Sequence, residues 1–125
     1  MKVIKTKNAP AAVGPYEAGI KIGKFIFTSG QIPLDPATSQ LITGSIEEQT
    51  HRCLKNIKGV LEAGGYSLND VVKTTVFLAD MNNFAAVNKV YAEYFVQQKP
   101  ARSCIQVAKL PKNANIEIEV TACKE

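Results

Sequence analysis

The pattern of apolar and polar positions predicts a β-hairpin in the first quarter of the chain. In "AGIKIGKFIFTSG", Ile20 and Ile22 alternate with other residues before Gly23-Lys24, and two phenylalanines alternate in the same way after it. Alternation on both sides of a two-residue turn is typical of a hairpin. The next stretch, "QIPLDPATSQLITG", contains two prolines and several turn formers, which indicates a loop.

Two amphipathic helices are predicted after this loop. The first begins at Ser45, because Glu48 stands three residues later, the spacing of a capping box, and it ends at Gly64-Gly65. The second runs from about Asn83 and is stopped by Pro100. Apolar residues at helical spacing form one face of each helix: Ile46, Cys53, Leu54, Ile57 and Leu61 in the first, and Phe84, Val87, Val90, Tyr91, Tyr94 and Phe95 in the second.

Three further strands are predicted, at residues 71–78, 103–108 and 116–123. The order β-β-α-β-α-β-β indicates an α+β fold, a single domain over residues 1–125 in which two helices cover one face of one sheet. Alternation assigns the strand faces. Ile116, Ile118 and Val120 oppose Glu117, Glu119 and Thr121 on the last strand, and Ile105 and Val107 oppose Arg102, Cys104 and Gln106 on the strand before it.

The second face of this sheet is predicted to be semi-polar, with Lys73, Thr75 and Phe77 on one of its strands. A face of this kind is either wet or buried against copies of the same chain. Aromatic and β-branched residues mixed with charge favour a symmetric oligomer, but the pattern does not fix its order.

Composition limits the class of protein. The 125 residues are 46% hydrophobic and 21% charged, as in ordinary globular proteins. No apolar run approaches the roughly 18 residues that a membrane span needs, and the first seven residues do not resemble a signal peptide. Cys53, Cys104 and Cys123 are odd in number and far apart, which argues against disulfides and predicts a cytoplasmic protein.

The net charge of +4 raises the question of nucleic-acid binding. The lysines are spread along the whole chain, without a dense cluster and without interleaved aromatic residues. Nucleic-acid-binding proteins usually concentrate charge on one surface, so this distribution argues against a polyanion site.

Arg102 and Glu117 have two interpretations. The first is a structural ion pair, since both residues are expected on the polar faces of the last two strands. The second is a site in which the Arg102 guanidinium grips a carboxylate with two parallel hydrogen bonds, which lysine cannot imitate, beside a Glu117 carboxylate that handles water.

Other reactive side chains lack partners in the sequence. Cys104 as a nucleophile would need a nearby base, and the only histidine, His51, lies on the first helix with nothing around it to serve as a partner. A small buried strand residue is the simpler interpretation of Cys104. The cysteines and His51 show no metal-ligand spacing, so no metal site is predicted.

Four positions are candidates for ligand contact. Gly30 ends the stretch "FTSG" without a β-carbon, so a ligand could touch the backbone there, with the Ser29 hydroxyl alongside. Asn88 is a poor helix former inside the second predicted helix and is expected to make a hydrogen bond. Tyr16 follows Gly-Pro at a turn, and its phenol could point into a cleft.

Four segments together resemble the Rid family of reactive intermediate deaminases, also called YjgF or L-PSP proteins. They are "NAPAAVGPYEAG", "FTSGQIPLDP", "VVKTTVFLADMNNFAAVNKVYAEYF" and "KPARSCIQVAKLPKNANIEIEV", in the family's order over nearly the whole chain. Within them, "PARSC" and "IEIE" are among the most diagnostic. The resemblance implies a chorismate-mutase-like α+β fold, a homotrimer and ligand clefts at the subunit interfaces.

The resemblance also implies an activity. Members of the archetypal branch hydrolyse 2-imino acids such as 2-iminobutanoate and 2-iminopropanoate, which arise from enamines released by PLP-dependent dehydratases, to 2-keto acids and ammonia without a cofactor. Matched residue by residue, Arg102 holds the substrate carboxylate and Glu117 is associated with the attacking water. The remaining matched positions line the cleft (Tyr16, Ser29 and Asn88) or lie against the ligand (Gly30 and the Cys104 backbone).

One departure and two rival functions remain open. The segment "VQQK" before Pro100 is shorter than in many relatives, which puts substrate preference in doubt more than the chemistry. Some relatives are described as translation inhibitors with ribonuclease activity or as partners of transcription regulators, which makes an RNA-directed or regulatory protein the alternative function. A third possibility is a metabolite sensor that binds keto or imino acids without turning them over.

Overall fold

The alternating strand β6 (Ile116–Cys123) lies inside a six-stranded sheet, between β3 and β4. In the computed structural model, which describes residues 1–125, the strand order is β1-β2-β3-β6-β4-β5. All neighbouring strands are antiparallel except β4 and β5, which are parallel, so the sheet is mixed. The other strands are β1 (Lys2–Ile4), β2 (Gly19–Ile22), β3 (Phe25–Thr28), β4 (Val71–Leu78) and β5 (Ala101–Gln106).

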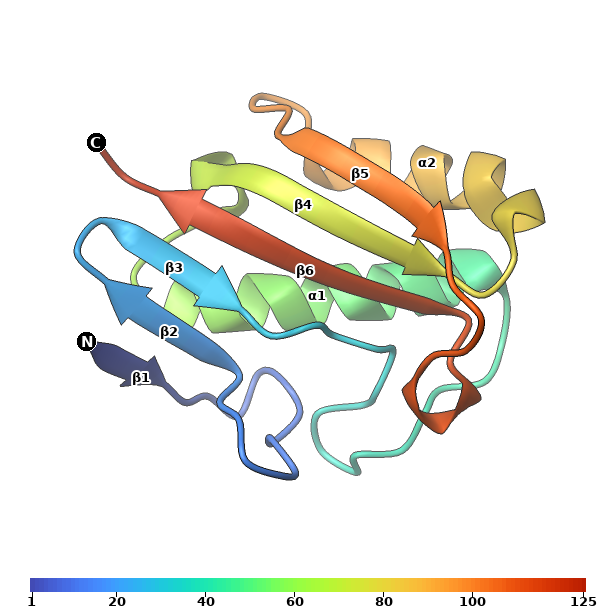
Figure 1. The fold of residues 1–125 in the computed structure, drawn as a ribbon, viewed down its shortest axis with the longest axis horizontal. Coiled ribbons are helices and arrows are strands. Elements are labelled where there is room, and N and C mark those ends of the chain that lie inside the picture. The colour runs from blue at the N-terminus through green and yellow to red at the C-terminus, as the bar shows by residue number, and fades with distance from the viewer.

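Both α-helices cover the same face of this sheet, which confirms the predicted α+β fold. Figure 1 shows α1 (Ile46–Ala63) and α2 (Phe84–Tyr94) behind the strands, with the other face uncovered. The core lies between these layers, where Ile116, Ile118 and Val120 pack against the apolar faces of the helices. Three single-turn 3₁₀ helices, η1 (Leu68–Asp70), η2 (Met81–Asn83) and η3 (Pro111–Asn113), lie in the connections. Neither α-helix has the length and apolar character needed to cross a membrane.

The predicted boundaries of the first helix are confirmed by its end contacts. The Ser45 hydroxyl accepts from the Glu48 backbone N–H at 3.1 Å, as the capping spacing predicts. The Glu48 carboxylate lies 3.5 Å from the same hydroxyl rather than closing the box on the Ser45 backbone. At the other end, Gly65 adopts the left-handed conformation with φ of 81°. A side chain there would be strained, so this residue ends the helix.

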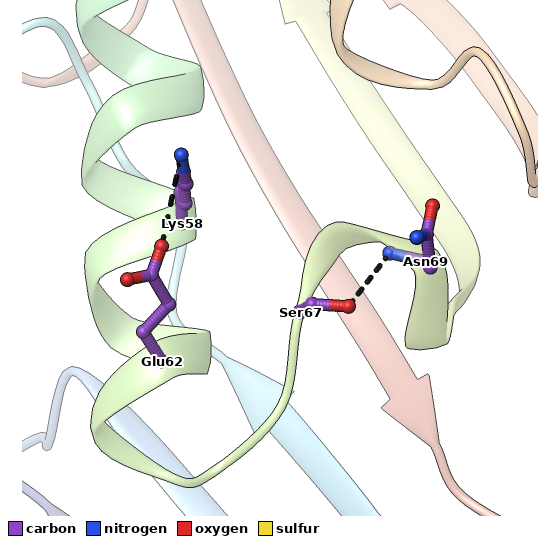
Figure 2. A network of polar contacts seen from close by, with 4 residues as sticks. All are labelled: Lys58, Glu62, Ser67 and Asn69. Atoms are coloured by element: carbon purple, nitrogen blue, oxygen red, sulfur yellow. Dashed lines mark hydrogen bonds and ion pairs between the residues drawn. The ribbon is translucent and has the colours of Figure 1, made fainter.

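Figure 2 shows how the chain turns from α1 into β4. Lys58 and Glu62, one helical turn apart on the exposed side of α1, form an ion pair of 3.8 Å. The Ser67 hydroxyl then accepts from the Asn69 backbone N–H at 3.2 Å, and the Asp70 carboxylate accepts from the Ser67 N–H at 2.8 Å. This reciprocal cap orders the single turn η1 directly before the strand.

The sequence-based assignment missed one strand, displaced another and extended the second helix too far, since α2 ends at Tyr94 and not at Pro100. Strand β1, three residues at the edge of the sheet, pairs with β2 and was not predicted. Strand β5 begins at Ala101 and ends at Gln106, two residues earlier than expected at each end. A three-residue edge strand carries too little alternation to be recognised, and β5 is defined by its register with β4 rather than by its own pattern.

The main correction to the fold concerns which side chains of β5 face the helices. Arg102 pairs with Thr74 and Cys104 pairs with Val76, and both of these β4 residues are buried under the helices. Arg102 and Cys104 therefore face α2, while Ile105 lies on the uncovered face with 46% of its surface exposed. The expectation that Arg102 and Glu117 share the polar face was wrong.

The uncovered face carries apolar side chains together with charge. The Phe25 and Phe27 rings stack on each other at 5.9 Å between centroids and are both exposed. Val3, Ile22 and Ile105 are exposed on the same face. This is the mixed surface that the strand patterns predict.

Candidate active site

Four of the predicted site residues line one pocket of about 560 Å3. It forms where the chain entering β2, the loop leaving β3 and the start of β6 come together. Tyr16, Ser29, Gly30 and Glu117 contribute to its wall, and these four are called the pocket group below. The rest of the wall is mostly apolar or small, and Glu117 is the one acidic residue that lines the pocket.

Glu117 and Gly30 are in close contact. A β-carbon built on residue 30 would overlap the Glu117 carboxylate, so only glycine leaves that side chain in place. The loop is held there by a two-bond backbone bridge: Gln31 N–H donates to Ile118 O at 2.8 Å, and Ile118 N–H donates to Gln31 O at 3.0 Å. The predicted close approach at Gly30 is thus made by a side chain of the site.

The pKa of the Glu117 carboxyl is raised above its ordinary value. Partial burial in the pocket is the main cause, because it disfavours the charged form, and the Glu119 carboxylate on the same face of β6 adds repulsion. A carboxylate with a raised pKa is a better proton acceptor than an ordinary one. Glu117 therefore holds a proton more readily than an exposed glutamate does.

The hydroxyl groups of the pocket group are held by the backbone. Ser29 Oγ donates to the Glu17 carbonyl at 2.5 Å, and the Ser29 N–H donates to Ala18 O, which fixes the chain on both sides of the pocket. The Tyr16 hydroxyl accepts from the Val13 N–H at 3.4 Å. About half of the surface of Tyr16 is exposed. Both groups reach the pocket without being committed to another side chain.

Arg102, Asn88 and Cys104 form a second set, called the arginine group below. The Arg102 Nη1 donates to the Asn88 Oδ1 at 2.6 Å, which confirms that Asn88 makes a hydrogen bond from within α2. The guanidinium carbon lies 4.8 Å from the centre of the Tyr91 ring and 5.5 Å from that of Phe84. Such contacts contribute about 0.5–1 kcal/mol each at partly exposed sites and orient the guanidinium plane.

The ring beneath the guanidinium is itself anchored. The Tyr91 hydroxyl and the Thr74 hydroxyl are 2.8 Å apart in the core, so Tyr91 is fixed to strand β4. Arg102 makes no ion pair, and Asn88 is the only side chain that accepts from it. A guanidinium has five N–H donors. Arg102 is therefore oriented by its neighbours but keeps donors for an external anion.

Cys104 follows Arg102 on the same side of β5 and is half-buried. Burial raises the pKa of its thiol, and the positive charge of Arg102 opposes that shift only in part. A thiol with a raised pKa is a weak nucleophile at neutral pH. This arrangement agrees with the structural interpretation of the side chain.

The pocket group and the arginine group do not meet within one chain. Glu117 on β6 and Arg102 on β5 are separated by β4, about 10 Å across the sheet, and point to opposite faces. The predicted structural ion pair between them is absent, and Lys58–Glu62 is the ion pair that forms. The first interpretation therefore fails within one chain.

The one histidine belongs to neither group. His51 Nδ1 lies 2.7 Å from the Tyr94 hydroxyl, so the expectation that it has no partner was wrong. It lines a separate surface depression on α1 with Arg52 and Lys55. No three His, Cys, Asp or Glu side chains come together as a metal site would require, and the three cysteines are free thiols.

Sequence reasoning missed three residues of the site. Tyr91 and Phe84 were assigned to the core, but they also support Arg102. Lys112 lines the pocket, and it stands with Asn113 in the left-handed conformation, at φ of 56° and 55°. Their signals were weak, because aromatic residues at helical spacing indicate a core, and one lysine in "KLPKNAN" resembles any loop lysine.

Taken together, this is a small α+β protein in which a guanidinium without an ion-pair partner and a partly buried carboxylate stand in separate groups. Comparison with known proteins specifies the family. The family model described as Endoribonuclease L-PSP matches residues 6–124, and the chain belongs to this family, the Rid or YjgF family that its motifs resemble.

Three similar proteins illustrate the range of the family. A RutC family protein of Pyrococcus horikoshii is 56% identical over 124 residues, which cover 99% of this chain and 98% of the relative. The 2-iminobutanoate/2-iminopropanoate deaminase of Salmonella typhimurium is 47% identical, with 98% of both chains covered. The crystal structure of E. coli TdcF with bound serine is 42% identical, covers 100% of both chains and has a TM-score of 0.96.

Proposed function

We propose that this protein hydrolyses small 2-imino acids, such as 2-iminobutanoate and 2-iminopropanoate, to 2-keto acids and ammonia. The observation that carries the proposal is the state of Arg102: its guanidinium is oriented by two rings and Asn88, yet it has no carboxylate partner in the chain. A fixed fork with free donors fits the planar carboxylate of a small organic acid. The deaminase and the serine-bound structure among the similar proteins point to the same ligand class.

The proposed site is completed between chains. Arg102 and Glu117 lie on opposite faces of one sheet, so both can reach one small molecule only if different copies supply them. The exposed apolar side chains on the uncovered face supply a surface for such an association. We infer a homotrimer in which each cleft combines the pocket group of one chain with the arginine group of its neighbour.

The chemistry needs a placed water and a proton acceptor. Arg102 holds the carboxylate of the protonated imine, and the Cys104 carbonyl accepts from the iminium N–H. Glu117 takes a proton from water while the water oxygen bonds to C2, and the C=N electron pair moves onto nitrogen. This step gives a carbinolamine and a protonated Glu117.

Collapse of the carbinolamine completes the reaction. The proton on Glu117 passes to nitrogen, with Tyr16 and Ser29 assisting the transfer. The hydroxyl proton then goes to Glu117 as the C–N bond breaks, its electron pair leaves on ammonia and the ketone forms. Ammonia takes the last proton and restores the Glu117 carboxylate. A protonated imine is already electrophilic, so this scheme needs no cofactor.

The substrates of this scheme must come from another enzyme. 2-Imino acids arise from the enamines that PLP-dependent dehydratases release, and spontaneous hydrolysis is the background against which this activity is measured. The proposed protein would act downstream of such a dehydratase. We expect it to work in the same compartment, the cytoplasm.

Ribonuclease activity, which the name of the family model raises, finds less support in the site. The one histidine is bonded to Tyr94 in a depression on α1, apart from the pocket that holds Glu117. Binding of RNA that falls steeply with salt and persists in Arg102→Ala would favour that alternative.

The proposal is tested by coupling the purified protein to a threonine dehydratase and following keto-acid formation, with semicarbazide competing for the imine. We expect the protein to raise the rate of keto-acid formation above that of spontaneous hydrolysis. The amount of semicarbazone formed should fall, because less imine remains for semicarbazide. Binding of keto acid without any rate increase would indicate a sensor instead. No effect of the protein on either product would contradict the proposed activity.

A further inference from the structure

The amide side chain of Asn56 in α1 is completely buried, and it is committed to the loop that walls the pocket. Its Nδ2 donates to Leu34 O at 2.9 Å and lies 3.5 Å from Ile32 O. Its Oδ1 accepts from Arg52 Nε at 3.2 Å. Both the Oδ1 and the Nδ2 of this buried amide therefore have hydrogen-bond partners. The Nδ2 donates to backbone carbonyls that lie outside α1.

Asparagine is a poor choice for the interior of a helix if only stability matters. It is a weaker helix former than leucine, and burial of an amide costs free energy that hydrogen bonds recover only in part. The positions around it on α1, Cys53, Ile57 and Val60, are apolar and fully buried. An apolar residue would suit that face of the helix, so the bonds to the loop are what this amide specifically provides.

The loop that Asn56 holds is part of the proposed site. Gln31, Ile32 and Leu34 line the pocket. On its other side the loop is fixed to β6 by the two backbone bonds between Gln31 and Ile118. Gly30 and Glu117 are the residues directly before these two bridge partners. The loop is thus clamped from the helix by Asn56 and from the sheet by β6, with the contact between Gly30 and Glu117 at its edge.

We propose that Asn56 is a positioning residue, which holds the loop at residues 31–34 so that Gly30 keeps the Glu117 carboxylate in place. The position of Glu117 depends on this clamp because the carboxylate rests on residue 30. Loss of the clamp would loosen the wall, admit water and let Glu117 move away from its working position. The kinetic part of this inference rests on the proposed deaminase function.

The test compares Asn56→Leu and Asn56→Asp with Gln49→Leu. Leucine has a similar volume and removes every hydrogen bond, whereas aspartate keeps the acceptor for Arg52 and replaces the donors to the loop with an oxygen that repels the two carbonyls. Gln49 is a matched control, because it is a buried amide two turns earlier on α1. Its bonds go to Gly44 O and Asn115 Nδ2. Neither Gly44 nor Asn115 lines the pocket.

Three readouts are expected to separate positioning from stability. Amide hydrogen exchange at Gln31 and Ile118 should accelerate in both Asn56 variants and not in Gln49→Leu. Turnover should fall by about tenfold or more in the Asn56 variants even where Gln49→Leu has lost as much thermal stability. In Asn56→Leu the acid limb of the pH–rate profile should move to lower pH, because a less buried Glu117 loses the burial that raises its pKa.

Unchanged exchange at Gln31 and Ile118, or equal acceleration in Gln49→Leu, would overturn the positioning role. A wild type with no deaminase activity would contradict the proposed function, while the exchange comparison would still decide the role of Asn56. If neither Asn56 variant folds, Arg52→Met leaves the Asn56 Oδ1 without its donor and lets the amide turn away from the loop. Exchange at Gln31 and Ile118 should then accelerate, and unchanged exchange would overturn the role.

Discussion

The pocket group and the arginine group differ in how each is held, and the difference separates their tasks. Three members of the pocket group lie on loops, and backbone bonds and one glycine place the Glu117 carboxylate of β6 against Gly30. The arginine group lies on a regular strand and helix, where aromatic rings and Asn88 orient a guanidinium with free donors. In the proposed function, the first group moves a proton and the second holds an anion.

Each group is incomplete alone. A guanidinium without a base can bind a carboxylate but cannot activate water, and a carboxylate without a counter-charge repels an anionic substrate. Their location on opposite faces of one sheet explains why an ion pair does not neutralise both within the chain. The following changes test this division, from the largest expected effect to the smallest.

Replacement of Arg102 is expected to have the largest effect. A charge-assisted bond is worth about 1.5–3 kcal/mol, so loss of the fork should lower kcat/KM by about one to two orders of magnitude. Arg102→Lys should be nearly as damaging as Arg102→Ala, because an ammonium cannot form two parallel bonds. The coupled dehydratase assay measures this. Lys89→Ala, an exposed cation on the next position of α2 after Asn88, is the control and should be unaffected.

Gly30→Ala tests the pocket group in the same way. The new methyl group would overlap the Glu117 carboxylate and displace it, so kcat should fall by about tenfold to a hundredfold. The matched control is Gly23→Ala, where a β-carbon meets no neighbour but φ is 55°. This control should lose stability and keep its kcat in the coupled assay. Equal activity of the two variants would contradict the placement of Glu117.

The pH dependence distinguishes the two groups without removing either. Activity should fall as the pH drops through the raised pKa of Glu117, because the base must be ionised. Glu119→Gln removes the neighbouring repulsion and lowers that pKa, so the acid limb should move to lower pH while KM changes little. An acid limb that stays in place would show that Glu119 does not act on the base.

The same group makes a prediction about stability. Folding raises the pKa of Glu117, so the folded state binds its proton more tightly than the unfolded state does. The free energy of unfolding should therefore fall as the pH rises from the unfolded to the folded pKa. In Glu117→Gln this pH dependence should be weaker, as measured by chemical denaturation across that range.

Cys104→Ala should have the smallest effect. The proposed mechanism uses only the backbone carbonyl of Cys104, and the raised pKa of the thiol keeps it protonated at neutral pH. We expect kcat/KM close to that of the wild type in the coupled assay. Loss of activity as large as in Arg102→Ala would indicate that the thiol takes part in the chemistry.

Much of the fold could be predicted from the sequence. The bounds of β4 and β6 follow from their alternation, and both ends of α1 follow from Ser45 and Gly64-Gly65. Strand β5 could not be oriented, because it carries half-buried Arg102 and Cys104 on one side and exposed Ile105 on the other. At an edge strand, hydrophobicity does not identify the inner face, and the register with β4 decides it.

The motifs predicted which residues belong to the candidate site, but not that these residues form two separate groups. Family resemblance identified all seven candidate positions, and the structure brings four of them into one pocket and three around the guanidinium. The separation depends on strand order, with β4 between β6 and β5, which no local pattern encodes. Asn56 was invisible for the same reason, since its partners Ile32 and Leu34 lie more than 20 residues away.

Subunit mixing tests most directly whether two chains build one site. Arg102→Ala and Glu117→Ala should each be nearly inactive alone. If equal amounts are unfolded together and refolded, random trimers should carry an intact Arg102 and an intact Glu117 in about one quarter of their clefts. We predict that the mixture regains about that fraction of wild-type activity. A refolded mixture that assembles but stays as inactive as its two components would contradict the shared site.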